Sequence, residues 1–226
     1  RAETLVRLEG HGREDLFDGL DTTRTVGWFT SLFPVRLTPA AALGDSIKAI
    51  KEQLRAVPNN GLGYGVLRYL GSDAAQRSLA ALAQGEIVFN YLGQLDGALA
   101  DDGALFAAAG EGSGQGQSPD APLSSLLAIN GQVLGGELEL TWSFSRELFD
   151  LRTVQALADA YGEELRQLIA HCVAAGVAGV TPSDFPLAGL DQAQLDSLPL
   201  APAQIADVYP LSPMQQGMLF HSLYEQ

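Results

Sequence analysis

The chain has 226 residues, 46% of them hydrophobic, which is enough for one or two ordinary domain cores. Its formal net charge is −14 and no run of lysine or arginine is present, which argues against nucleic-acid binding. The single cysteine, Cys172, excludes an internal disulfide, and no apolar stretch is long enough to cross a membrane. We therefore expect a cytoplasmic protein with neither a nucleic-acid nor a membrane partner.

The first part of the chain mixes strands with short helices. Residues 1–8 are strand-like and lack an initiator methionine, so we expect the parent protein to be longer. Residues 25–37, rich in β-branched and aromatic types, predict a largely buried strand. A helix then runs to about residue 57, and Asp45 or Ser46 can cap it. The remaining elements here are a turn at 58–61, short helices at 64–70 and 74–82, and a strand at 86–91.

A strand pair and a long helix are expected next, after an exposed Gly/Ser/Gln loop at 110–119. The strands are predicted at 123–130 and 136–145, and the second alternates apolar with polar residues. Asp150 can cap a helix that reaches about residue 175 and carries one apolar stripe. An antiparallel-looking sheet with packed helices is α/β in the broad sense, without a βαβ repeat.

The composition changes after Gly176. Residues 177–208 are rich in Ala, Gly and Pro and predict an ordered linker with one short helix near 191–198. Ser212 and Gln215 can form a capping box with proline at the first helical position, so a new helix begins there. We therefore divide the chain into a main domain (1–176), the linker (177–208) and the first helix of a following domain (209–226).

Residues 9–14, Glu-Gly-His-Gly-Arg-Glu, stand where the first strand leaves the sheet. Two glycines let the backbone approach a ligand closely and leave Glu9, His11 and Arg13 unshielded by neighbours. On residue types alone, a charged surface turn explains the segment as well as a binding site does.

The order of the short motifs favours a site. Residues 9–14 are followed by Arg-Thr-Val-Gly-Trp-Phe-Thr-Ser at 24–31, Gly-Leu-Gly-Tyr-Gly at 61–65 and Phe-Asn-Tyr-Leu-Gly-Gln at 89–94. In composition and spacing this series resembles the epimerization domains of non-ribosomal peptide synthetases, along essentially the whole chain. Residues 209–221 resemble the opening motif of the condensation domain that follows such a domain.

The resemblance implies the chloramphenicol-acetyltransferase-like fold, in which two lobes face each other across a tunnel. This chain would be the carboxyl-terminal lobe, with a mixed sheet and packed helices. The family's other catalytic motif, two adjacent histidines followed by an aspartate, lies in the amino-terminal lobe. It has no counterpart here, because His11, His171 and His221 are all isolated. We therefore expect the fragment alone to be inactive.

The implied reaction is inversion at the Cα of an L-aminoacyl or peptidyl thioester on the phosphopantetheine arm of a carrier protein, with no directly bound cofactor. Glu9 would be one of two groups that take and return the proton. Arg13 would orient Glu9 or hold charge, and Asn90 and Tyr91 would line the tunnel and stabilise the enolate. His11 matches the motif and either takes part directly or satisfies backbone groups. The implied partners are the amino-terminal lobe, an upstream peptidyl carrier domain and a downstream condensation domain.

Other chemistries fit the sequence less well. A pyridoxal-dependent racemase needs a lysine, but Lys48 and Lys51 are expected on the solvated face of a helix. No His, Cys or acid cluster has metal-ligand spacing. Residues 43–47 resemble a phosphopantetheine attachment motif with Ser46 as acceptor, although a preceding strand favours helix capping. Residues 110–116 lack the lysine and the helix of a phosphate loop.

Two alternatives remain open. A condensation domain shares the fold but forms peptide bonds, and residues 9–14 together with 89–94 favour epimerization over it. A catalytically silent lobe that only docks carrier proteins is the third interpretation.

Overall fold

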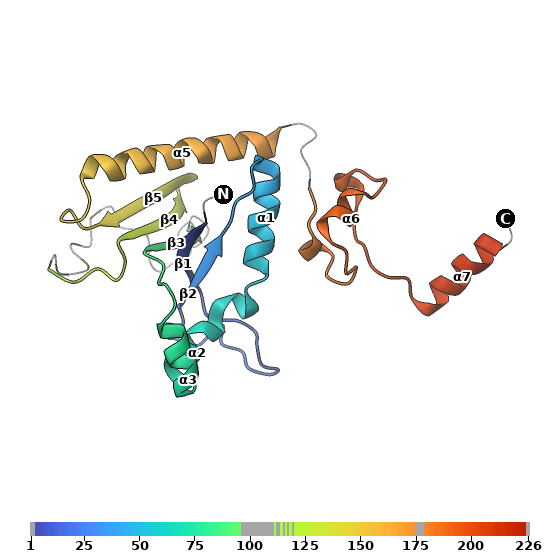
Figure 1. Cartoon of the computed structure of the whole chain (residues 1–226), viewed down its shortest axis with the longest axis horizontal. Coiled ribbons are helices and arrows are strands. Elements are labelled where there is room, and N and C mark those ends of the chain that lie inside the picture. The colour runs from blue at the N-terminus through green and yellow to red at the C-terminus, as the bar shows by residue number, and fades with distance from the viewer. Residues whose placement is uncertain are drawn as a thin grey trace. The chain divides into compact units, whose positions relative to one another are not determined.

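The computed structural model describes residues 3–95, 111, 114, 116, 118, 120–174 and 179–224. The chain divides into two units, one formed by Arg1–Thr38 and Val57–Leu165 and the other by Pro39–Ala56 and Arg166–Gln226 (Figure 1). Most of the loop expected at 110–119 lies outside the described residues.

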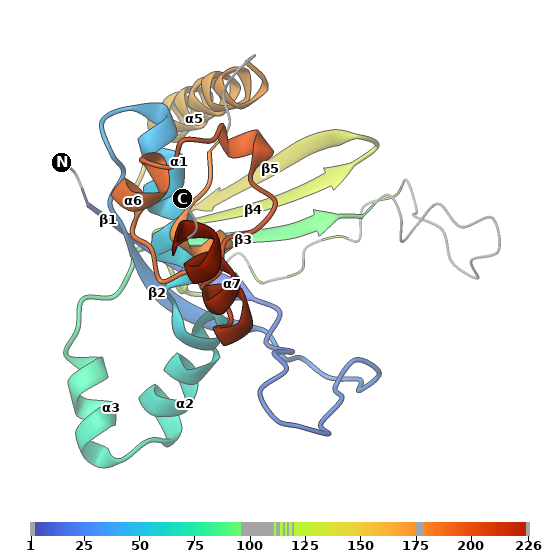
Figure 2. The same ribbon diagram turned by 90° about the vertical axis from the view of Figure 1, so that its right-hand side faces the viewer.

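The first unit is built on a five-stranded sheet in the order β2-β1-β3-β4-β5. The strands are β1 (Thr4–Gly10), β2 (Ser31–Leu37), β3 (Ile87–Gln94), β4 (Leu127–Leu134) and β5 (Glu137–Phe144). The outer pairs β1–β2 and β4–β5 are antiparallel, whereas β1–β3 and β3–β4 are parallel. Figure 2 shows β3, β4 and β5 side by side. The sheet is therefore mixed, and the antiparallel appearance inferred from the sequence holds only for its two outer pairs.

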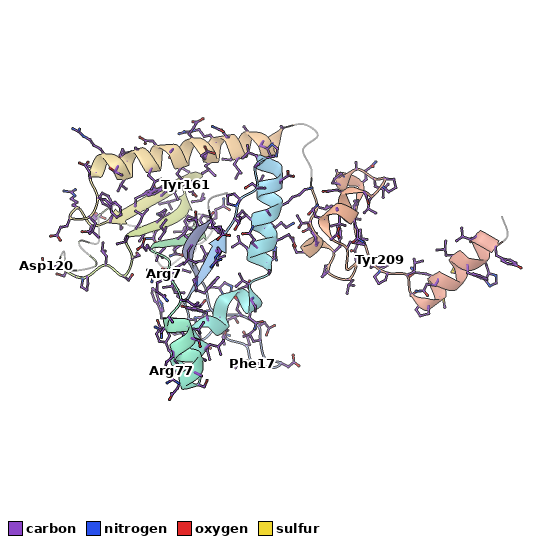
Figure 3. The ribbon with its side chains drawn as sticks, in the orientation of Figure 1. Arg7, Phe17, Arg77, Asp120, Tyr161 and Tyr209 are labelled. Atoms are coloured by element: carbon purple, nitrogen blue, oxygen red, sulfur yellow. The ribbon has the colours of Figure 1, made fainter. Side chains whose placement is uncertain are left out.

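One face of the sheet is covered by α5 (Leu151–Val173). Val154 of this helix forms the buried core with Leu127 and Ile129. Tyr161 stands edge-on to Trp142, with the ring centres 5.7 Å apart (Figure 3). The Asp150 carboxylate accepts a 2.7 Å hydrogen bond from the backbone N–H of Arg152, so the predicted cap of this helix is confirmed.

The predicted alternation of β5 is also confirmed in its second half. Leu140, Trp142 and Phe144 are partly buried and pack against the core, while Thr141 and Ser143 between them are exposed. This alternation follows from the two-residue period of a strand with one covered face.

The strand predicted at 25–37 is wrong over its first half. The regular strand begins only at Ser31, and Val26 and Trp28 are 100% and 90% exposed. The reason is the length of the neighbouring strand, because Gly10 at the end of β1 pairs with Ser31. Residues before Ser31 have no strand beside them to supply backbone hydrogen bonds.

A short helical segment connects β2 to β3 within this unit. It consists of the 3₁₀ turn η1 (Pro58–Gly61), α2 (Leu62–Leu70) and α3 (Asp73–Ala80). Asn59, Asn60 and Gly61 all have left-handed backbone conformations, which only glycine and asparagine adopt readily. They turn the chain sharply into α2, and the turn predicted at 58–61 is confirmed.

The second unit begins with α1 (Leu43–Arg55), for which the predicted cap is wrong. Ala42 occupies the capping position and offers no side-chain hydrogen bond. Ser46 already lies inside the helix, and its backbone N–H donates to the carbonyl of Ala42 at 2.8 Å. Asp45 stands in the first turn, where its charge favours the positive end of the helix.

The part of the linker that the structure describes is ordered. It contains η2 (Pro182–Asp184), α6 (Gln192–Asp196) and η3 (Pro202–Gln204), and α7 (Pro213–Tyr224) follows. The predicted capping box of α7 is confirmed, since Ser212 and Gln215 exchange backbone-to-side-chain hydrogen bonds of 2.8 and 3.4 Å. The domain boundaries at 176 and 208 stay predictions.

The two lysines of α1 form ion pairs with aspartates of the linker. Lys51 pairs with Asp184 at 2.6 Å, and Lys48 pairs with Asp196 at 2.8 Å. Both lysines remain partly exposed, with 25% and 33% of the side chains of Lys48 and Lys51 accessible, and the structure adds an ion pair to each.

Candidate active site

Glu9 lies near the end of β1 on the face opposite α5. Val6 and Leu8 pair in register with Ile87 and Phe89, which pack on the α5 core. Because strand side chains alternate, Glu9 points to the other face, where it is partly buried. No side-chain hydrogen bond or ion pair joins Glu9 to another residue in the described part of the chain.

Asn90 shares this face with Glu9. Leu8 of β1 pairs with Phe89 of β3, and the next residues of the two parallel strands are Glu9 and Asn90. Asn90 in turn pairs with Asn130, and its side-chain amide donates to the Asn130 side-chain oxygen at 3.2 Å. Asn90, Asn130 and Thr141 form a polar row across β3, β4 and β5, and Glu9 pairs with Leu32 of β2.

Tyr91 lies on the opposite face from Asn90. It pairs with Gly131, and a side chain at Gly131 would meet Leu140 at 2.9 Å and the Tyr91 ring at 3.4 Å. Leu140 belongs to the core against α5, so the Tyr91 ring occupies the same face. The structure thus places Glu9 and Asn90 on one face of the sheet and Tyr91 on the other, with 53% of Tyr91 exposed.

The loop after Glu9 folds back on the segment that precedes β2. At Gly12 the backbone has a φ of +66°, and a Cβ there would lie 1.6 Å from the carbonyl oxygen of Phe29. Only glycine permits this approach, which fixes where the chain leaves β1.

Arg13 holds this loop together. Its guanidinium donates to the backbone carbonyls of Thr22, Thr25 at 2.7 Å and Gly27 at 3.3 Å. The guanidinium carbon also lies 4.1 Å from the centre of the Phe29 ring. No hydrogen bond or ion pair links Arg13 with Glu9 in the described residues. Its observed contacts are therefore with the loop and not with the Glu9 carboxylate.

His11 is held within its own turn. Its Nδ1 accepts a 3.0 Å hydrogen bond from the backbone N–H of Arg13, and its Nε2 lies 3.3 Å from the Glu14 carboxylate. Glu14, whose side chain is only 15% exposed, also accepts a 2.7 Å hydrogen bond from the side-chain amide of Asn60. Of the two roles expected for His11, these contacts fit the structural one. Through Glu14 they also connect the loop to η1.

Sequence reasoning missed three residues near this site: Arg7, Glu14 and Asn60. Arg7 stands two positions before Glu9 in the same strand and therefore shares its face, a signal that the strand period alone provides. Asn60 carried no such signal, because its contact with Glu14 depends on the left-handed turn at 59–61.

Among the described residues of the first unit, Arg7 lines two hollows. The larger, about 1410 Å³, is lined by Gly85, Ser124, Ser143 and Arg146 among others. The smaller, about 500 Å³, is lined by Phe29, Leu32, Tyr64 and Tyr69 among others. Neither has Glu9, Asn90 or Tyr91 in its lining.

The described side chains contain no group of three His, Cys, Asp or Glu residues placed to hold a metal ion. None of the helices in that part of the chain combines the length and apolar character needed to span a bilayer.

Residues 1–185 match the family model described as the condensation domain, and the chain belongs to this family. It is thus a condensation-family domain of the non-ribosomal peptide synthetases, with the α/β fold expected from the sequence.

Known relatives agree with this assignment. One of the linear gramicidin synthase proteins of Brevibacillus parabrevis is 51% identical over 224 residues, which are 98% of this chain and 3% of that protein. Tyrocidine synthase 1 of the same organism is 37% identical over 208 residues, 87% of this chain and 19% of that one. The chain therefore spans only a small part of these relatives.

A solved structure is also similar. It is the crystal structure of the epimerization domain from the third module of tyrocidine synthetase B. The TM-score is 0.66 at 40% sequence identity, and the match covers 75% of this chain and 37% of that one. The resemblance to epimerization domains drawn from the short motifs is confirmed.

Proposed function

We propose that this lobe supplies Glu9 as one of the two acid–base groups that epimerize a carrier-bound L-aminoacyl or peptidyl thioester to the D form. The observation that carries the proposal is the placement of Glu9 on the same face of the sheet as Asn90, one residue past the Leu8–Phe89 pair and without a protein partner among the described residues. Similarity to a solved epimerization domain supports it.

The chemistry requires a group on each side of the reacting carbon. A thioester makes its α-proton removable, because the resulting carbanion spreads onto the carbonyl oxygen as an enolate. Inversion follows when the proton leaves from one face and another returns from the opposite face. Glu9 takes or returns the proton on one side. The histidine motif known in the family has no match among residues 1–226, so a different part of the domain supplies the second group.

Asn90 assists by hydrogen bonding. An amide nitrogen carries two N–H groups, and the contact with Asn130 uses one of them. The other donates to the enolate oxygen as negative charge develops there. Tyr91 supports β3 from the α5 side, and Arg13 and His11 keep the loop after Glu9 in place.

The substrate implies the partners. A peptidyl carrier domain upstream presents the thioester on its phosphopantetheine arm, and the amino-terminal lobe completes the tunnel. A condensation domain downstream then accepts a D-configured donor. We place the reaction in the cytoplasm, and we expect no other cofactor to bind this lobe directly.

The test is solvent deuterium incorporation at the α-carbon of a loaded carrier, measured by mass spectrometry with the intact domain. Replacement E9Q is expected to slow exchange at least about a hundredfold, because an amide accepts no proton at neutral pH. The matched control is E3Q, which makes the same charge change at an exposed position. Wild-type exchange in E9Q would remove Glu9 from the mechanism.

A condensation function is the second candidate, since the matching family model is that of the condensation domain. The same loaded carrier, offered with an acceptor aminoacyl carrier, distinguishes the two. Peptide-bond formation without deuterium exchange would favour condensation. Exchange that yields a mixture of L and D products, with no new peptide bond, supports epimerization.

A further inference from the structure

We infer that Arg7 binds a backbone carbonyl oxygen in the peptide part of the substrate, so that the site takes a peptidyl rather than an aminoacyl thioester. The inference rests on the proposed function of Glu9 and goes beyond it by naming the substrate class.

Arg7 lies at the right distance from the reacting carbon for this role. It shares the face of β1 with Glu9 and stands two residues earlier, a separation of about 7 Å at the rise of a β-strand. An extended substrate peptide advances by the same amount per residue. A chain that leaves the carbon beside Glu9 therefore reaches Arg7 within the two preceding residues.

The guanidinium has donors to spare. One Nη atom donates to the carbonyl of Ser124 at 2.5 Å, whereas the buried Nε has no acceptor. No ion pair joins Arg7 to a carboxylate in the part of the chain that the structure describes. A guanidinium carries five N–H groups, and leaving them unsatisfied in a partly buried place costs free energy. The enclosed Nε is out of a ligand's reach, but a substrate carbonyl could accept from the remaining Nη N–H groups, which have no acceptor among the described residues.

The surroundings leave room for a peptide. Arg7 lines two hollows formed by described residues of the first unit, so its side chain borders open space. Figure 3 shows Arg7 among the strands of the sheet. The larger hollow, about 1410 Å³, exceeds what a single amino acid fills, and its serines supply further polar contacts.

The absence of a side chain at Gly85 makes room for the Arg7 side chain. A Cβ at Gly85 would lie 3.2 Å from the Cγ of Arg7 and 3.1 Å from the backbone carbon of Val6. The stem of Arg7 therefore passes closely over Gly85, and a side chain at this position would press on it.

The experiment compares the binding of non-reactive substrate analogues to the intact domain. Aminoacyl and tripeptidyl groups are attached to pantetheine through an amide in place of the thioester, and dissociation constants are measured by calorimetry. R7M is expected to weaken the tripeptidyl analogue about tenfold to a hundredfold, as the loss of a hydrogen bond to a charged group does, and the aminoacyl analogue less than about twofold. Equal weakening of both, or no change in either, would overturn the inference.

A second measurement needs no protein variant and so does not depend on the folding of R7M. Tripeptidyl analogues in which a trans-alkene replaces one or the other peptide bond lack the corresponding carbonyl oxygen. At least one of them should bind the wild type about tenfold more weakly and bind R7M no more weakly than the parent compound does. Unchanged binding of both by the wild type contradicts a role for Arg7.

Deuterium exchange on the same proteins separates the two proposals. Selective binding of the tripeptidyl analogue without any α-proton exchange would mean that the proposed epimerization fails while the peptide site stands. If the wild type exchanges the α-proton and R7M changes the binding of neither analogue, the proposed epimerization stands and the peptide site at Arg7 fails.

Discussion

The ammonium group of Lys51 donates to both carboxylate oxygens of Asp184, at 2.6 and 2.7 Å, and so joins α1 to η2. This hydrogen bonding lowers the pKa of Asp184 below its ordinary value, and the backbone N–H of Thr181 lowers it further. A group with a depressed folded-state pKa stabilises the fold above its ordinary pKa, and this contribution is lost as the pH falls through the folded value.

We therefore expect the attachment of η2 to be insensitive to pH above the ordinary aspartate value of 3.8 and to weaken in more acidic solution. K51M should reduce this acid dependence, leaving the part that the hydrogen bond from Thr181 causes, and destabilise the attachment by about 0.5–1 kcal/mol, since the pair is partly exposed. Amide hydrogen exchange over residues 179–196 between about pH 3 and 7 measures both effects. K48M is the comparison, because its partner Asp196 lies in α6. Identical acid profiles for wild type and K51M would contradict the assignment.

Replacing Arg13 should loosen the loop that follows Glu9. R13M removes the donors to three backbone carbonyls and the contact with Phe29, and a loss of about 2 kcal/mol is expected. R13K should restore little of the lost stability, because one ammonium group cannot reproduce the hydrogen-bond geometry of the planar guanidinium. Urea unfolding and proteolysis of the loop measure the effect. R24M, an exposed arginine in the same loop, is the control and should behave as wild type.

Gly12 and Gly19 provide a matched pair for the close approach in this loop. Both have a positive φ, but only Gly12 faces the carbonyl oxygen of Phe29, while a Cβ at Gly19 meets nothing within 4 Å. G19A should cost about 1 kcal/mol from backbone strain alone. G12A should lower the free energy of unfolding several times more, because the loop at Gly12 must move away from the backbone at Phe29. Thermal unfolding of the two variants provides the comparison, and equal losses would show that the contact is unimportant.

Asn90 and Tyr91 are adjacent but should differ in their effect on the reaction. N90A is expected to slow α-proton exchange about a hundredfold to a thousandfold, as removal of a donor to an oxyanion does. Y91F keeps the ring that packs on the α5 side and should change the rate less than about threefold, within ordinary context effects. Single-turnover deuterium exchange in the intact domain measures both. A larger effect of Y91F would show that the phenol reaches the reacting atoms.

Local signals in the sequence predicted much of the fold. The alternation in β5 and the capping residues Asp150 and Ser212 all depend on residues close to one another in the chain, and each was confirmed. The start of β2 was missed because it depends on where β1 ends. The parallel pairing of β1 with β3 joins segments far apart in the chain, and no short pattern encodes that contact.

For the candidate site, too, the sequence predicted what depends on nearby residues and missed what depends on distant ones. Glu9 and Arg13 could be named from one motif, but their separate surroundings could not. The guanidinium of Arg13 finds its acceptors at Thr22, Thr25 and Gly27, whose positions depend on the path of the whole loop. Asn90 and Tyr91 were grouped because they are neighbours in sequence, although the pleat of a strand directs neighbours to opposite faces.

The alternation along β1 also constrains the engineering of hybrid synthetases. Arg7 and Glu9 face away from α5, while Val6 and Leu8 beside them face the core. A fusion that inserts or deletes one residue in this strand would turn a carboxylate to the face that α5 covers and a leucine to the opposite face. Junctions for exchanging modules should therefore be placed outside Thr4–Gly10, where a change in length leaves the strand register intact.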